Sequence, residues 1–365
     1  MTFNIRENGF KIESRLPTAL FNEAPFIYTG PDFMSFPLGM ISDIINNKNR
    51  SIQRFFPITI SKFQGKILVD QMFCFSFFYV NDEDDLIFYL THPFWFDRSN
   101  MKDTMDFFIM QIEGFANKMN CNQIELEIHE NFTSCIAYPT SLSHLSYYLN
   151  RDRFQADDLK FFQRYGFNEV NSLFCYEQCL EGIEKNLKDK ISDAKKYKAK
   201  IINQSDFIKI KDKINNSFIK AFSLSTKDLI VSHRLLPPFN KSMFILNKKN
   251  KTSMNSSING FVQWVPNLFE LFRKRCSPIP YLHYHNFKDF PFKCGKIINW
   301  AIDEERDELV IALIYHTINM MKKRGIKKCQ FGFIHNKQDF MYNILKFCGF
   351  SKVHTIKLLK RKVLE

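Results

Sequence analysis

Residues 161–167 read FFQRYGF, and residues 344–350 read ILKFCGF. Each stretch is apolar with one basic residue, ends in Gly-Phe, and is followed by a segment with strand-like composition. Glycine often ends a helix because it adopts the left-handed conformation without a steric penalty. Both stretches are therefore predicted to be the last turns of helices that end at Gly166 and Gly349. The two glycines are separated by about half of the 365-residue chain, which indicates an internal repeat.

The elements predicted upstream of each Gly-Phe also repeat, in the order strand, helix, strand, helix, strand. Their type follows from apolar spacing, which is three and four residues in a helix and two in a half-buried strand. In the first half these elements are predicted at 85–92, 101–120 and 122–131, then the helix that ends at Gly166 and the strand after it. In the second half they are predicted at 296–302, 307–325 and 328–336, then the helix that ends at Gly349 and the strand after it.

The repeat divides the chain into a first domain at 1–182, a linker helix at 183–202 and a second domain at 203–365. The linker is rich in lysine and acidic residues and is predicted to be a solvated helix. The first domain carries a loop-rich insertion at about 132–154. Upstream of its repeated elements, a hairpin is predicted that turns at Gln64 and Gly65.

Composition restricts the classes of function. The chain is 45% hydrophobic and long enough for two domains with sizeable cores. Its net charge of +13 favours anionic partners such as coenzyme A or nucleic acid, although a lysine-rich solvated surface explains it equally well. The basic patches at 272–275, 322–328 and 357–362 lack the interleaved aromatic residues of a known RNA-binding module, so a nucleic-acid partner is supported by charge alone.

Nine cysteines without a CxxC pair, and no apolar run long enough to span a bilayer, predict a cytoplasmic chain with reduced thiols and no membrane span. His283 and His285 alternate on one predicted strand face, but no third ligand is in view. No metal site is therefore predicted.

The repeated order, with Asn131 and Asn336 at the ends of the strands before the Gly-Phe helices, resembles the GNAT superfamily of acyl-CoA-dependent N-acyltransferases. The stretch GFVQWVPN at 260–267 is similar to a segment of long bacterial GNAT-like proteins. The resemblance covers most of the chain in two copies. It implies an α/β (α+β) fold of two tandem GNAT-like domains, each a mixed, mostly antiparallel sheet flanked by helices.

The resemblance also implies where acetyl-CoA or a longer acyl-CoA would lie. The strand before the long helix would separate from its neighbour, and its amides would hold the pantetheine and polarise the thioester carbonyl. The pyrophosphate would lie at the N-terminus of the long helix. The implied cofactor-binding residues are Trp300, Ala301, Ile302, Arg306, Leu309, Val310 and Asn336 in the second half, with Arg98 and Lys102 in the first.

Catalysis in such a fold needs a base for the acceptor amine and an acid for the departing thiolate. Glu304 follows the strand 296–302 and is the candidate base. Tyr342 is the candidate acid, one helical turn before Leu345. The acceptor would be an amine on a small molecule or a peptide.

The chain departs from the family pattern at the phosphate-binding loop, where glycines let the backbone approach the phosphates. Leu309 and Ile311 hold those positions in the second half, and Met101 and Asp103 hold them in the first. Three hypotheses therefore stay open. They are an N-acyltransferase with one degenerate half, a catalytically inactive GNAT-like binding or scaffold protein with a basic surface, and a nucleic-acid-binding protein.

Overall fold

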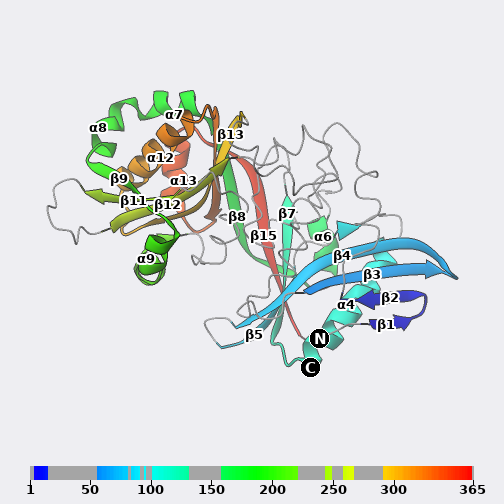
Figure 1. The fold of residues 1–365 in the computed structure, drawn as a ribbon. Helices are drawn as coiled ribbons and strands as arrows, with labels where there is room; N and C mark the ends of the chain where they lie inside the picture. The colour runs from blue at the N-terminus through cyan, green and yellow to red at the C-terminus, as the bar shows by residue number, and fades with distance from the viewer. Residues whose placement is uncertain are drawn as a thin grey trace.

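The structure is a computed structural model that describes residues 4–14, 56–80, 84–90, 94–95, 101–130, 158–220, 243–248, 258–266 and 291–363. The strands of these residues form one mixed sheet that runs through both halves of the chain (Figure 1). The predicted insertion at about 132–154, Arg98 and the two histidines at 283 and 285 lie outside the described residues.

The first half confirms the predicted order of elements. A long hairpin of β3 and β4 turns at Gly65, which has a φ of 64°. Strand β5 and helix α4 come next, and the half ends with the helix α6 and the strand β8. The bounds are β1 Asn4–Glu7, β2 Phe10–Glu13, β3 Phe56–Gln64, β4 Ile67–Val80, β5 Leu86–Leu90, β6 Phe94–Trp95, α4 Met101–Lys118, β7 Gln123–Glu130, α6 Asp158–Arg164 and β8 Asn168–Cys179.

The second half has the same order, and Gly349 ends its last helix with a φ of 82°. Its sheet runs antiparallel except where β13 lies parallel to β14. The bounds are α7 Leu180–Leu187, α8 Ile191–Ala194, β9 Tyr197–Ile201, α9 Gln204–Ser217, β10 Ile219–Lys220, β11 Met243–Lys248, β12 Ile258–Pro266, β13 Cys294–Ile302, α12 Asp307–Lys322, β14 Lys328–His335, α13 Asp339–Phe347 and β15 Ser351–Lys362.

The stretch predicted as one linker helix at 183–202 differs in the structure. It contains most of α7, a 3-10 turn, α8 and the strand β9, which pairs with β11. Ile183, Leu187 and Tyr197 are fully or nearly fully buried in the core of the second half. The burial of these three side chains attaches the stretch to the second half. The prediction of a solvated linker helix, which rested on the lysine and acidic residues, is therefore wrong for this stretch.

The closing strands of the two halves are exchanged. Strand β15 of the second half lies between β7 and β8 of the first half, and β8 pairs with β14 of the second half. All three pairings are antiparallel. The central order β7-β15-β8-β14 therefore joins the halves into a single sheet, where the sequence had predicted a separate sheet for each domain.

Ion pairs link β15 to the first half. The basic patch predicted at 357–362 lies on this strand, and three of its side chains contact glutamates. One partner, Glu125, is only 2% exposed, so its charge needs a close cation. The pairs are Lys357–Glu169 at 3.0 Å, Lys360–Glu125 at 2.9 Å and Arg361–Glu113.

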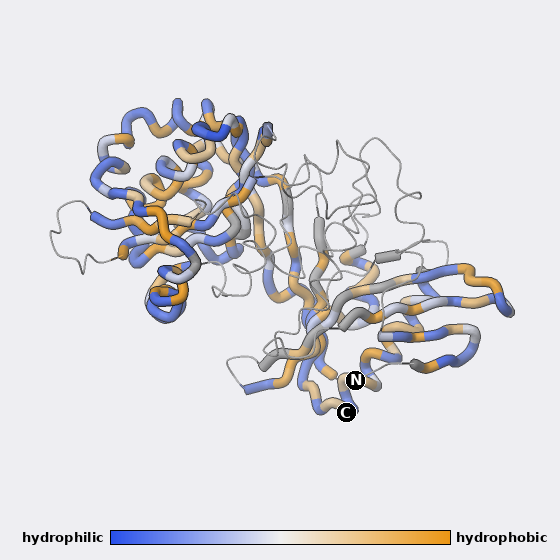
Figure 2. The backbone as a smooth tube through the Cα atoms, in the orientation of Figure 1, coloured by the Kyte–Doolittle hydropathy of each residue, from blue (hydrophilic) through white to orange (hydrophobic). Residues whose placement is uncertain are grey.

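Each half has its own hydrophobic core. Met105, Phe108 and Ile112 of α4 are fully buried on one helical face, as their spacing predicted. Leu359 belongs to this first core although it lies on the C-terminal strand. Helix α12 is buried on most sides in the second core, and Figure 2 shows hydrophobic residues along α12 and the strands beneath it, with more hydrophilic outer helices. Among the described helices, none has the length and apolar character needed to cross a bilayer.

Candidate functional site

In each half one strand of a parallel pair continues beyond the end of the pairing. Strands β13 and β14 pair from Cys294 to Ile297 and then part, although β13 continues to Ile302. The register between β12 and β13 shifts at the same level, which is a bulge that redirects the strand. In the first half, β5 and β7 pair as far as Leu90 and Leu126, and β7 continues to Glu130. Acyl-CoA was expected beside the strand that precedes each long helix, which is β13 in the second half and β5, described as far as Leu90, in the first.

Strand β10 occupies the edge of β13 in the second half. Ile219 pairs with Ile302, and Lys220 pairs with Ala301, while β12 pairs with the opposite edge of the same residues. Gln338, which follows β14, donates from Nε2 to the Lys220 carbonyl oxygen at 3.2 Å. Strand β10 and Gln338 therefore connect β13 and β14 at the place where pantetheine was expected to pair with β13.

The predicted residues of the second half are placed as follows. Trp300 is buried in the second core, and the backbones of Ala301 and Ile302 pair with β10. Leu309 and Val310 are fully buried, and their N–H groups donate to the Arg306 carbonyl oxygen at 3.0 and 3.4 Å. Their amides thus form the first turn of α12.

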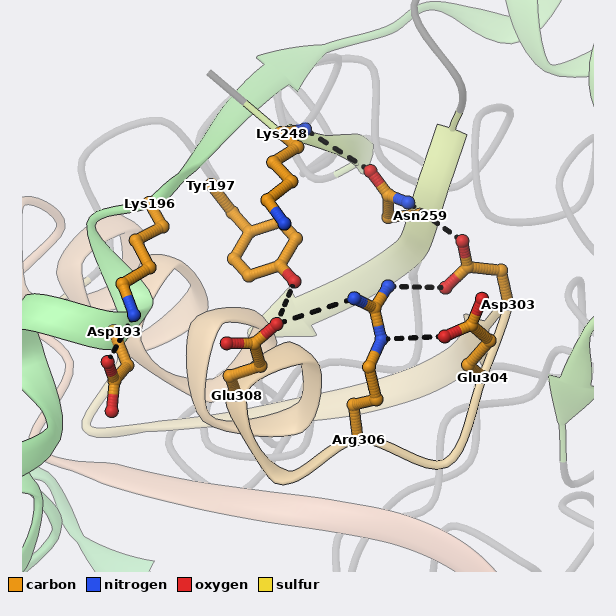
Figure 3. A network of polar contacts seen from close by, with 9 residues as sticks. All are labelled: Asp193, Lys196, Tyr197, Lys248, Asn259, Asp303, Glu304, Arg306 and Glu308. Carbon is orange, nitrogen blue, oxygen red and sulfur yellow. Dashed lines mark hydrogen bonds and ion pairs between the residues drawn. The ribbon is translucent and has the colours of Figure 1, made fainter. Parts of the chain in front are cut away.

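Arg306 lies among three carboxylates at the N-terminus of α12 (Figure 3). Its guanidinium contacts Glu304 at 2.9 Å, Glu308 at 3.4 Å and Asp303 at 3.7 Å. The carboxylates outnumber the single guanidinium, so the potential here is unfavourable for a pyrophosphate. The acidic residues instead suit the positive end of the helix dipole.

Two further side chains hold this network in place. The Tyr197 hydroxyl donates to Glu308 at 2.6 Å, and the Asn259 amide donates to Asp303 at 2.7 Å. Burial, together with the hydrogen bond to Glu308, raises the pKa of Tyr197 above its ordinary value. The tyrosine therefore stays a donor, and Glu304, the predicted base, is ion-paired to Arg306.

The N-terminus of α4 in the first half has a different environment. Lys102 is exposed and lies 3.6 Å from Asp106, and Lys62 contacts Asp103 at 2.8 Å. The hydrogen bond from Lys62 lowers the pKa of Asp103. Lysine ammonium groups near a helix N-terminus provide positive charge for an anion.

A buried carboxylate on β4 contacts the first turn of α4. Asp70 of β4 is 3% exposed and accepts hydrogen bonds from the Thr104 hydroxyl and from the Gln71 backbone N–H, both at 2.7 Å. Gln71 in turn donates to Ser61 at 2.8 Å. These bonds fix the first turn of α4 to the sheet. Sequence reasoning missed this cluster, because a single Asp in a strand pattern gives no signal of its partner.

Tyr342 and Asn336 line one pocket beside α13, away from Arg306. Tyr342 is 44% exposed, and its ring centroid lies 6.2 Å from that of Tyr176 on β8. Burial first, and then the neighbouring Tyr342, raises the pKa of Tyr176 to about 12. Burial and the nearby Lys337 lower the pKa of His335. The predicted acid and the predicted base, Glu304, therefore lie in different surroundings.

Solved structures with a fold similar to that of this chain include N-acetyltransferases. One similar solved structure is a GCN5-related N-acetyltransferase from Sphaerobacter thermophilus, with a TM-score of 0.54 and 9% identity over 99% of this chain and 98% of that one. Another, from Enterococcus faecalis, is a conserved protein of unknown function described as a probable N-acyltransferase, with a TM-score of 0.53 and 9% identity over 97% of this chain and 72% of that one.

The chain has the GNAT fold. The sequence itself matches no protein-family model and no curated protein. At 9% identity the similarity concerns the GNAT fold and not the chemistry. The residues must therefore carry the argument for function.

Proposed function

We propose that the protein is an acyl-CoA-dependent N-acyltransferase that transfers an acetyl or longer acyl group to an amine of a small molecule or peptide. The observation that supports it is a GNAT fold in which a strand runs beyond the end of its parallel pairing in each half, β13 past Ile297 and β7 past Leu126. Amides on the unpaired edge of such a strand can donate to a thioester carbonyl, which becomes an oxyanion during transfer. In the second half β10 pairs with this edge at Ala301 and Ile302. No metal is part of the proposal, and a cytoplasmic location fits the supply of acyl-CoA.

The first half is the half proposed to hold acyl-CoA. Its helix begins beside Lys62 and Lys102, and Arg98 precedes that helix. Lys62 and Lys102 would exchange Asp103 and Asp106 for the pyrophosphate, and Arg98 would add a third cation. The absence of loop glycines at Met101 and Asp103 counts against close backbone contact, so side-chain contacts must carry more of the binding.

The second half has the corresponding residues in a closed arrangement. Acyl-CoA could bind there only if β10 left the edge of β13 and Arg306 left its carboxylates. The residues that would then hold acyl-CoA are Trp300, Ala301, Ile302, Arg306, Leu309, Val310 and Asn336. In that state Glu304 would act as the base and Tyr342 as the acid. We propose that this half is the degenerate one in the conformation described.

The alternative is a catalytically inactive GNAT-like protein that binds an anionic partner. The closed second half favours it, as do the missing loop glycines. A nucleic-acid partner has less support, because the basic residues of β15 at 357, 360 and 361 are paired with glutamates.

Calorimetric titration with CoA, acetyl-CoA and octanoyl-CoA tests the proposal. Lys102→Ala and Arg98→Ala should each weaken binding about tenfold, since a hydrogen bond from a charged group contributes about 1.5–3 kcal/mol. Lys118→Ala, at the other end of α4, makes the same charge change and should not alter the affinity. Arg306→Ala should also leave it unchanged.

Turnover separates the enzyme from the binding protein. Release of free CoA in the presence of an amine acceptor would support the acyltransferase, and binding without release would favour the alternative. If none of the three CoA species binds, the proposed acyltransferase is wrong.

A further inference from the structure

A pocket of 470 Å³ lies where the exchanged strands meet α13. Phe174 and Tyr176 enter it from β8 of the first half, Tyr342 and Lys346 from α13, and Lys352 from β15. Because these walls come from both halves, the pocket is a product of the strand exchange. Its volume lies within the range of small-molecule sites, about 300–1,000 Å³.

The inner wall of the pocket is aromatic. Phe174, Tyr176 and Phe350 line it, and Tyr342 faces Tyr176 with a tilt of 49° between the rings. Tyr176 and Phe350 are almost completely buried, so their positions are held by the core. Such a wall suits a flat apolar body, because aromatic rings stack with an offset or edge to face.

The rim of the pocket is positive. Lys352 Nζ lies 4.6 Å from the Phe174 ring centroid, and Lys346 Nζ lies 6.0 Å from that of Tyr342. Within the described part of the chain, neither lysine is paired with a carboxylate, in contrast to Lys357 and Lys360 further along β15. Both ammonium groups are therefore available at the rim.

The other titratable groups around the pocket do not cancel the positive charge of Lys346 and Lys352. Asp339 is the carboxylate that lines it, and it offsets one of the two lysines. Burial and Lys337 lower the pKa of His335, so its imidazole is neutral near pH 7. The pocket thus combines an apolar interior with a net positive rim.

We propose that this pocket binds a small anionic aromatic molecule, with its ring between Phe174 and Tyr176 and its carboxylate or phosphate at Lys346 and Lys352. The exposed amide of Asn336 provides a further polar contact at the rim. The site shares Asn336 and Tyr342 with the closed second half but no residue with the proposed acyl-CoA site of the first half, so it stands whether or not acyl-CoA binds to the first half.

Calorimetric titration of the full chain with phenylacetate, phenyl phosphate and the neutral analogue phenylacetamide tests this site. Both anions should bind, and phenylacetamide should bind about fivefold more weakly than phenylacetate, since it lacks the charge that the lysines attract. The double variant Lys346→Gln/Lys352→Gln should reduce the affinity for both anions to the level of the amide.

The matched control is Lys209→Gln/Lys323→Gln, which removes the same charge at exposed positions outside the pocket. It should bind both anions as the unmodified chain does. The proposal is overturned if neither anion binds, if phenylacetamide binds as tightly as phenylacetate, or if the two double variants behave alike.

Discussion

Gly349 and Gly166 end corresponding helices with nearly the same left-handed conformation, but their surroundings differ. A Cβ at Gly349 would lie 2.5 Å from Asn186 Nδ2 and 2.8 Å from Gln178 Nε2, whereas a Cβ at Gly166 would meet Arg361 no closer than 3.8 Å. We predict that Gly349→Ala lowers the free energy of unfolding by about 2–3 kcal/mol and Gly166→Ala by about 1–2 kcal/mol, since only the first adds crowding to backbone strain. Urea denaturation measures both values.

Gly114 gives the control for these two substitutions. It lies inside α4 without a positive φ, and nothing lies within 4 Å of a Cβ built there. Gly114→Ala should therefore raise the free energy of unfolding by about 0.5–1 kcal/mol, because alanine favours the helix. Equal losses at Gly349 and Gly166 would show that crowding by Asn186 and Gln178 has no effect.

At the scale of elements, β10 is held by few contacts, and Gln338 supplies one of them. Gln338→Ala removes the hydrogen bond to the Lys220 carbonyl oxygen. We predict that amide hydrogen exchange in the segments 219–220 and 299–302 becomes about fivefold faster, which corresponds to about 1 kcal/mol for one hydrogen bond. Mass spectrometry of the exchanged peptides provides the measurement.

The control is Gln163→Ala, at an exposed position of α6, which should leave the exchange of these segments unchanged. Unchanged exchange in Gln338→Ala would mean that β10 does not depend on this bond.

The types of most repeated elements could be predicted from the sequence, because periodicity reports which face of a segment is buried. Helix α4 shows this with Met105, Phe108 and Ile112. Periodicity does not report the partner of a strand, so the exchange of β8 and β15 could not be foreseen. Strand β10 has only two residues, too few for any pattern. The pocket was missed for the same reason, since Phe174 and Tyr176 reach it only through the exchange.

For the whole molecule, Glu169 of β8 connects the halves through Lys357 of β15. Burial acts to raise the pKa of Glu169, but hydrogen bonds from Ser172 and Lys357 outweigh it and lower the pKa below the usual 4.5. A lowered pKa contributes stability that is complete above 4.5 and is lost as the pH falls through the folded-state value. We predict that Glu169→Gln lowers the free energy of unfolding at pH 7 by about 0.5–1 kcal/mol, a value reduced for solvent screening.

This difference between Glu169→Gln and the unmodified chain should shrink as the pH falls below 4.5, because the unmodified side chain then becomes neutral too. Urea denaturation at several pH values gives the comparison. Glu7→Gln, which removes the same charge at an exposed position of β1, is the matched control. A difference that stays constant down to about pH 3 would exclude the ion pair as its cause.

The exchange itself predicts which half responds to a change in the C-terminal strand. Leu359 of β15 is fully buried in the first core, and Leu345 of α13 is fully buried in the second. Each substitution to alanine should cost about 2–5 kcal/mol, because a cavity replaces the side chain. Leu359→Ala should accelerate amide exchange chiefly in α4 and β7, and Leu345→Ala chiefly in α12 and β14. If Leu359→Ala instead acted on α12 and β14 alone, its strand would belong to the second core and the halves would not share their closing strands.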